Sequence, residues 1–161
     1  MTARAEELTF RRLREGDLGD VCDLVRETID TSYAAVYPLL VVEFFHQYHE
    51  RTIVIGDAAS GHTIVVHSGG RLVATGTRAG TTVRRVFVRA AWQRRGIGQK
   101  VMAELEAASL AEGIERLDLS ASLPAKEFYL RLGYAIVSEE DYEVAPSQHL
   151  EYYEMAKALR R

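Results

Sequence analysis

The sequence predicts a mixed α/β domain whose strands and helices follow one another in the order βααβββαβαββ. Apolar residues alternate in some segments and recur every three or four positions in others, which is typical of strands and helices respectively. Because the two kinds of segment do not alternate regularly, we expect one sheet with helices on both faces, not a simple parallel alternation. No repeat, low-complexity tract or linker divides the chain, so residues 1–161 are predicted to form a single domain.

The N-terminal third is predicted to form a strand and two helices. "LTFRRL" (8–13) alternates as a strand does, and Asp17 is expected to cap the helix that follows. The apolar stripe of that helix is Leu18, Val21, Cys22, Val25 and Ile29. Pro38 opens a second helix. Its stripe is Leu40, Val41, Phe44, Phe45 and Tyr48.

The remaining elements follow from turn residues and periodicity. "TIVVHSGGRLVATGTRAG" (63–80) reads as two strands joined at "SGGR", and a third strand covers 81–88. A helix is expected over 96–112, with Ile97, Val101, Leu105 and Ala108 buried and Gly113 ending it. A strand over 116–122, a helix over 124–132 that Gly133 ends, and two closing strands in "YAIVS" and "LEYYEMAKAL" complete the chain.

Composition excludes several classes of partner. The chain has 20 basic and 23 acidic residues, a net charge of -3, so we expect no general attraction to nucleic acid. No apolar run approaches the ~18 residues of a membrane span, and the first residues lack the apolar core of a signal peptide. The single cysteine, Cys22, cannot form an intramolecular disulfide. These features predict a cytoplasmic protein without membrane or nucleic-acid partners.

A glycine-rich loop in "VFVRAAWQRRGIGQK" (86–100) joins a predicted strand to a predicted helix. Unpaired backbone N–H groups at a helix start, together with the helix dipole, favour an anion, and Arg94, Arg95 and Lys100 add charge. The loop lacks the Lys-Ser/Thr pair of a nucleotide P-loop, and Val101 stands where a dinucleotide fingerprint has its third glycine. Two interpretations of the loop are left: a binding site for another phosphate-bearing ligand, or a plain turn with solvated arginines.

Two motifs resemble those of one enzyme superfamily. Residues 93–98 read Q-x-x-G-x-G, which is similar to the acyl-CoA-binding motif of the GNAT N-acetyltransferases. "SLPAKEFYLRLGY" (122–134) then matches the A-x-x-F-Y-x-x-x-G-Y/F pattern of that superfamily through Ala125, Phe128, Tyr129, Gly133 and Tyr134. The strong match covers about residues 72–137. This resemblance implies a mostly antiparallel sheet of six or seven strands with helices on both faces.

The resemblance also implies acetyl-CoA as co-substrate. The cofactor contacts that it implies are Val86, Phe87, Val88, Gln93, Arg94, Arg95, Gly96, Ile97, Gly98, Gln99, Lys100, Ser122, Lys126 and Tyr129. Relatives often have an asparagine where this chain has Ser122, which can instead cap the next helix. Tyr129 matches the usual general acid, since a phenol of pKa ~10 can donate to a departing thiolate of pKa ~8.5. The alternative is an ordinary core tyrosine.

The general base is not evident. Many relatives carry a glutamate on the strand before the loop, but "TTVRRVFV" contains no acidic residue. Asp118 is the first candidate, with the alternative of a buried structural hydrogen-bond acceptor. Glu143, His67, Glu27 or a chain of waters are the others. Cys22 as an acyl-enzyme nucleophile is disfavoured, because the family transfers the acetyl group directly.

The acceptor is expected between the first two helices and the last strands. Aromatic residues Tyr33, Tyr37 and Phe45 lie on one side and Glu143, within an acidic stretch, on the other. This combination suits a small cation such as an amine, although a solvated acidic loop and an ordinary core explain it equally. His46 and His49 are three apart on a helix; we expect surface or interface histidines and no metal.

The sequence therefore predicts an acetyl-CoA-dependent N-acetyltransferase that transfers directly to a primary amine of a small molecule or peptide in a ternary complex. The alternative is a non-catalytic acyl-CoA-binding or sensor module of the same fold, and a nucleotide hydrolase is a distant third. Because many relatives form dimers, the resemblance also implies a homodimer.

Overall fold

A single mixed sheet organises the chain in a computed structural model, which describes residues 7–160. Its strand order is β1-β2-β3-β4-β5-β7-β6. The strands are β1 (Leu8–Arg12), β2 (His62–Ser68), β3 (Arg71–Ala79), β4 (Thr82–Val88), β5 (Arg116–Ser122), β6 (Ala135–Ala145) and β7 (Gln148–Ala158). Neighbouring strands are antiparallel except β4 and β5, which are parallel. The predicted mixed, mostly antiparallel sheet is confirmed.

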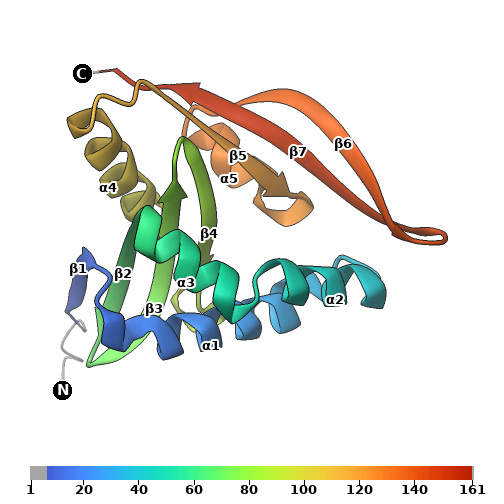
Figure 1. Cartoon of the computed structure of the whole chain (residues 1–161), viewed down its shortest axis with the longest axis horizontal. Coiled ribbons are helices and arrows are strands. Elements are labelled where there is room, and N and C mark those ends of the chain that lie inside the picture. The colour runs from blue at the N-terminus through green and yellow to red at the C-terminus, as the bar shows by residue number, and fades with distance from the viewer. Residues whose placement is uncertain (1–6, 161) are drawn as a thin grey trace.

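Helices cover both faces of this sheet (Figure 1). One face carries α1 (Leu18–Thr28), a π-helical turn (Ile29–Tyr33), α2 (Leu39–Tyr48) and α3 (Arg51–Ser60). The other carries α4 (Ile97–Ala111) and α5 (Lys126–Arg131). Short 3-10 turns lie at Glu15–Asp17, Ala90–Trp92 and Leu123–Ala125. In the described part of the chain, no helix has the length and apolar character needed to cross a membrane.

Three local predictions need correction. Helix α3 was not predicted, because Gly56 interrupts it and only Val54 of its residues is buried, which leaves no clear apolar stripe. The acidic stretch before Glu143 belongs to β6 and not to a loop, since it pairs with β7 up to Glu143 opposite His149. The Asp17 side chain does not cap α1. Its carboxylate instead accepts hydrogen bonds from the Arg14 amide at 2.7 Å and from Arg11.

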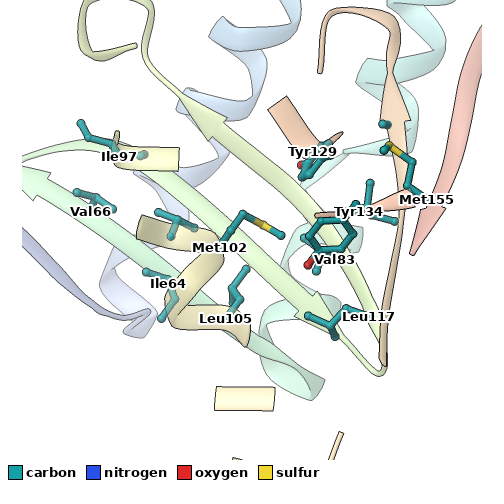
Figure 2. Close-up of a cluster of buried hydrophobic side chains, with 14 of the residues drawn as sticks. Ile64, Val66, Val83, Ile97, Met102, Leu105, Leu117, Tyr129, Tyr134 and Met155 are labelled. Atoms are coloured by element: carbon teal, nitrogen blue, oxygen red, sulfur yellow. The ribbon is translucent and has the colours of Figure 1, made fainter. Parts of the chain in front are cut away.

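The core has two layers, one on each face of the sheet. Figure 2 shows the layer under α4, where Met102 and Leu105 pack with strand residues such as Val83 and Leu117. Gly76 on β3 allows this close packing, because a Cβ there would lie 2.5 Å from Cγ1 of Val101. The second layer joins α1, α2 and α3 to the opposite face. These two layers fix the position of β4 between the helices.

Strands β4 and β5 meet at one end and separate toward the other (Figure 1). Their pairing is confined to Thr82 opposite Asp118 and Val83 opposite Leu119. Beyond it, β4 contains a bulge: Thr75 and Thr77 of β3 face Phe87 and Arg84, so two residues of β4 oppose Gly76 alone. One of them, Arg85, has a left-handed backbone with φ 55. The divergence leaves a gap in the middle of the sheet.

Candidate active site

The loop before α4 presents a row of free backbone donors. Arg94 and Gly96 have left-handed φ values of 63 and 77, which turn the chain sharply from β4 into the helix. Within the described residues, no N–H group of residues 94–99 donates to another protein group, and the first such bond runs from the Lys100 amide to the Gly96 carbonyl. Since α4 has 15 residues, its dipole adds positive potential at this end. The loop can therefore bind an anion through several amides.

The same loop is held against the gap between β4 and β5. The Gln93 side-chain amide donates to the Val88 carbonyl at 3.0 Å, which ties the loop to the end of β4. A Cβ on Gly98 would lie 3.2 Å from Cζ of Phe128 and 3.7 Å from Cγ2 of Val88. The absence of a side chain at Gly98 thus allows α4, α5 and β4 to pack closely together. This packing holds the loop before α4 next to the end of β4.

The cationic side chains of this loop and its first helical turn, and Lys126 on α5, make no ion pairs among the described residues. The Arg95 guanidinium lies over Trp92, 4.8 Å from the ring centroid. The Lys100 ammonium lies 4.1 Å from the centroid of Phe10. Lys126, at the start of α5, lies 4.8 Å from the Tyr153 ring. These cation–π contacts keep the positive charges on one end of the sheet and leave them available to phosphates.

A cavity of about 300 Å³ opens beside the gap and extends under α2 and the β6–β7 hairpin. We call it the central cavity. It is lined by Tyr33, Phe44, Phe45, Tyr48, His49, Thr82, Val83, Arg84, Arg85, Val86, Phe87, Ser120, Ser122, Ala125, Tyr129, Tyr142, Leu150 and Tyr152. Its volume lies at the small end of the range for ligand pockets. Tyrosine and phenylalanine side chains are the largest group in its wall.

Tyr129 lies on α5 where the gap meets the central cavity. Its side chain is buried, and burial, with a smaller contribution from Tyr33, raises the pKa of its phenol well above the ordinary value. The hydroxyl makes no hydrogen bond to other described protein groups, unlike that of neighbouring Tyr134, which donates to Glu106 at 3.1 Å. Tyr129 is therefore a protonated donor with a free hydrogen over the neutral pH range.

Among the cofactor residues predicted from sequence, Val86, Phe87, Ser122 and Tyr129 line the central cavity. The side chains of Val86 and Val88 pack on the α4 side of the sheet and Phe87 on the α1–α3 side. The remaining predicted contacts form the loop before α4 and its first turn, apart from Lys126 at the start of α5. The structure thus places the predicted residues around the β4–β5 gap, on both of the strands that border it.

Predicted acceptor residues separate into two groups. Tyr33 and Phe45 line the central cavity, with ring centroids 4.5 Å apart, and burial raises the pKa of Tyr33 to about 12. Tyr37 lies behind the wall, where its hydroxyl accepts from the Leu123 amide at 2.8 Å and donates to the Glu151 carbonyl at 3.0 Å. Glu143 lies at the β6–β7 turn, where it accepts from the Ser147 amide at 3.2 Å.

None of the four base candidates lines the central cavity. Asp118 lies at the joined end of β4 and β5, and its carboxylate accepts from Thr81 at 2.9 Å and Thr82 at 2.6 Å. Glu27 pairs with Arg89, and His67 lies 3.8 Å from Asp17. No aspartate or glutamate is found in the cavity wall. Both Asp118 oxygens thus already accept a hydrogen bond from a threonine hydroxyl.

The charged residues of the central cavity are two arginines that the sequence analysis did not select. Arg84 and Arg85 both lie near Asp57 of α3, and Arg85 also donates to Nδ1 of His49 at 3.3 Å. Burial and the two guanidinium groups lower the pKa of His49 to about 3, so its ring is neutral at pH 7. The sequence feature that could have identified these two residues is the presence of adjacent arginines within a mostly apolar strand.

His46 and His49, near the end of α2, contact different partners. His46 bonds to Asp30 at 2.7 Å, whereas His49 faces Arg85. In the part of the chain that the structure describes, no group of three or more His, Cys, Asp or Glu side chains could hold a metal ion. The two histidines therefore serve separate contacts.

The fold and the site define a class of protein: an α/β domain with uncovered backbone amides at a helix start, beside a gap between two parallel strands. The sequence matches the "Acetyltransferase (GNAT) domain" family over residues 27–159. This chain belongs to the GNAT acetyltransferase family, as the two motifs predicted. Acetyl-CoA is accordingly its co-substrate. A comparison with curated proteins finds no significant match.

Several solved structures share this fold. A GCN5-related N-acetyltransferase from Rhodopseudomonas palustris shares 18% identity with a TM-score of 0.84, covering 98% of this chain and 99% of that chain. The PaiA N-acetyltransferase from Thermoplasma acidophilum, in complex with coenzyme A, shares 16% identity with a TM-score of 0.75, covering 94% of this chain and 99% of that chain. YncA of Salmonella typhimurium, a putative acetyltransferase with its cofactor acetyl-CoA, shares 16% identity with a TM-score of 0.68, covering 96% of this chain and 95% of that chain.

Proposed function

We propose that the protein is an acetyl-CoA-dependent N-acetyltransferase that acetylates a primary amine of a small molecule directly, in a ternary complex. One observation carries this proposal: the free amides of residues 94–99 lie at the same gap that opens onto the Tyr129 hydroxyl. A phosphate bound at these amides and a thioester beside Tyr129 would thus lie along one path. A peptide amine is the alternative acceptor within the same proposal.

The chain's residues fit acetyl-CoA. The amides of residues 94–99 would hold its pyrophosphate, with Arg94, Arg95 and Lys100 close by. The exposed backbone of β4 beyond the bulge would pair with its pantetheine arm, because β5 has moved away there. When bound, acetyl-CoA supplies the acetyl group as an activated thioester.

Tyr129 would donate a hydrogen bond to the departing sulfur. A phenol whose pKa is raised by burial stays protonated, so its role is hydrogen-bond donation to the sulfur position and not proton abstraction. Cys22 lies on α1 and does not line the central cavity, which supports direct transfer over an acyl-enzyme on that thiol.

With no carboxylate in the cavity wall to act as a base, the cavity itself would have to lower the pKa of a bound amine. Burial disfavours a charged ammonium, and so does the nearby Arg84 guanidinium. Both effects lower the pKa of a bound amine and raise the fraction that is neutral and nucleophilic. We therefore propose that the cavity itself favours loss of the amine proton, with water as the immediate acceptor.

The test is thiol release from acetyl-CoA across a panel of primary amines, with product identified by mass spectrometry. We expect turnover with at least one small amine, together with micromolar CoA binding. The missing strand glutamate favours the second candidate, a non-catalytic acyl-CoA sensor. CoA binding without thiol release from any amine or peptide would support the sensor and contradict the enzyme.

Assembly and location belong to the same proposal. We propose a homodimer, supported by the edge strand β6, where Ile136 and Val137 are exposed. Light scattering during size-exclusion chromatography measures its mass. The single thiol, Cys22, fits a cytoplasmic location.

A further inference from the structure

The wall of the central cavity carries positive charge, whereas a site for a simple cationic amine is expected to carry negative charge. Its ionised wall residues are Arg84 and Arg85, and no carboxylate lines it. A polyamine or alkylammonium ion would have to enter a cavity whose nearest charges repel it. The wall therefore selects for a feature of the acceptor other than positive charge.

Arg85 is already neutralised within the protein. Its side chain is 1% exposed and pairs closely with Asp57, while a second N–H group donates to Nδ1 of His49. A buried arginine with these two partners is a structural ion pair. It uses the carboxylate that would otherwise balance its neighbour.

Arg84 is left with a charge that the protein does not balance. Its one ion-pair contact in the described structure is to the same Asp57 oxygen, at 3.5 Å, and 34% of its side chain is exposed. Two guanidinium groups thus share one carboxylate, and the neutral His49 adds no negative charge. A guanidinium with donors to spare is the group that best recognises a planar carboxylate.

We propose that the acceptor is a small amino carboxylate, such as an amino acid with an apolar or aromatic side chain, whose carboxylate is bound by Arg84. The cavity volume of about 300 Å³ and its aromatic wall fit a compact apolar body beside that anion. This inference rests on the proposed function, because it names the class of amine that the site acetylates.

Binding of the acetylated products tests the inference without turnover and without an ammonium group. Calorimetric titration of the CoA-saturated protein compares N-acetyl-L-phenylalanine with N-acetyl-L-phenylalaninamide, and N-acetyl-L-leucine with its amide. We expect each acid to bind at least tenfold more tightly than its amide. Arg84→Gln should remove this preference while the affinity for CoA stays the same, and Arg84→Lys should keep part of it.

Arg116→Gln, at an exposed arginine that opens β5 outside the central cavity, is the matched control and should keep the full preference. Equal or tighter binding of the amides, equal loss of both ligands in Arg84→Gln, or no binding of either pair would overturn the inference. Failure of the proposed function is distinguishable, because it would show as no thiol release from any amine while the acid preference persists.

Discussion

Tyr129 combines a buried ring with a hydroxyl that has no protein partner in the described structure. For Tyr129→Phe we expect kcat to fall by about 10²-fold, because a positioned proton donor is lost. The dissociation constant for CoA and the melting temperature should change little, because no protein hydrogen bond is removed. Steady-state thiol release and calorimetry measure the two quantities.

Tyr134→Phe is the matched control, since this tyrosine neighbours Tyr129 but bonds to Glu106 and does not line the central cavity. It should lower stability and leave kcat near the parent value. A Tyr129→Phe enzyme with kcat within twofold of the parent would exclude the proposed donor role.

His49 should make the fold sensitive to mild acid. Its pKa is about 3 in the folded chain against an ordinary value of 6.5, so the unfolded chain binds the extra proton first as pH falls. The stabilisation is complete above pH 6.5 and declines toward pH 3, by up to about 1.4 kcal/mol per pH unit. In His49→Gln, urea unfolding between pH 7 and 5 should show a shallower pH slope than in the parent.

Asp17 does not confuse this measurement. The hydrogen bond from Arg11 is the main cause that lowers the pKa of Asp17 to about 2, so its contribution is lost below pH 3.8 and outside the window. His149→Gln, at an exposed position on β7, controls for the substitution itself. An unchanged slope in His49→Gln would show that its protonation is not coupled to unfolding.

At the scale of elements, we expect the loop before α4 to bind the phosphates of CoA through its backbone amides, because no protein group accepts their hydrogen bonds in the described structure. Gly98→Val should abolish measurable CoA binding, since the first added carbon would lie 3.2 Å from Cζ of Phe128 and the start of α4, which carries the amides, would have to move. Gly19→Val on α1, where no atom lies within 4 Å of an added Cβ, is the control and should bind CoA normally. Isothermal titration gives both affinities.

Arg94→Ala tests the side-chain share of the same site. This exposed arginine adds about 1 kcal/mol at most, so we expect CoA to bind roughly fivefold more weakly. The comparison separates main-chain from side-chain binding. A larger loss in Arg94→Ala than in Gly98→Val would contradict the assignment of the phosphate to the amides.

For the whole molecule, Tyr37 joins regions that are distant in sequence. Its hydroxyl connects the segment after α1 to Leu123 at the end of β5 and to Glu151 on β7. Tyr37→Phe should lower the free energy of unfolding by about 1–3 kcal/mol, because two backbone groups lose their partner. The melting temperature should fall by about 2–4 °C per kcal/mol.

Tyr142→Phe provides the comparison, because this tyrosine is 54% exposed and its hydroxyl has no bond to other described groups. Its melting temperature should match the parent. Equal stability of Tyr37→Phe and the parent would mean that water replaces the phenol at both backbone groups.

Local patterns predicted most elements, and the exceptions have local reasons. The helix at Ile97 and the short helix ended by Gly133 were predicted because periodicity and stop signals agree there. Helix α3 escaped prediction because its sequence alone has no strong preference, and its packing on β2 and β3 decides its conformation. The long β6–β7 hairpin likewise depends on pairing between strands.

The sequence by itself determined the family and the acyl donor. Those properties depend on a contiguous loop, residues 93–98, and on one short helix around Tyr129, so spacing along the chain is enough to reveal them. Only the tertiary structure decided the charge of the central cavity. The β4 bulge and the packing of α3 bring Arg84, Arg85 and Asp57 together, whereas pairing with β7 keeps Glu143 at a distant turn.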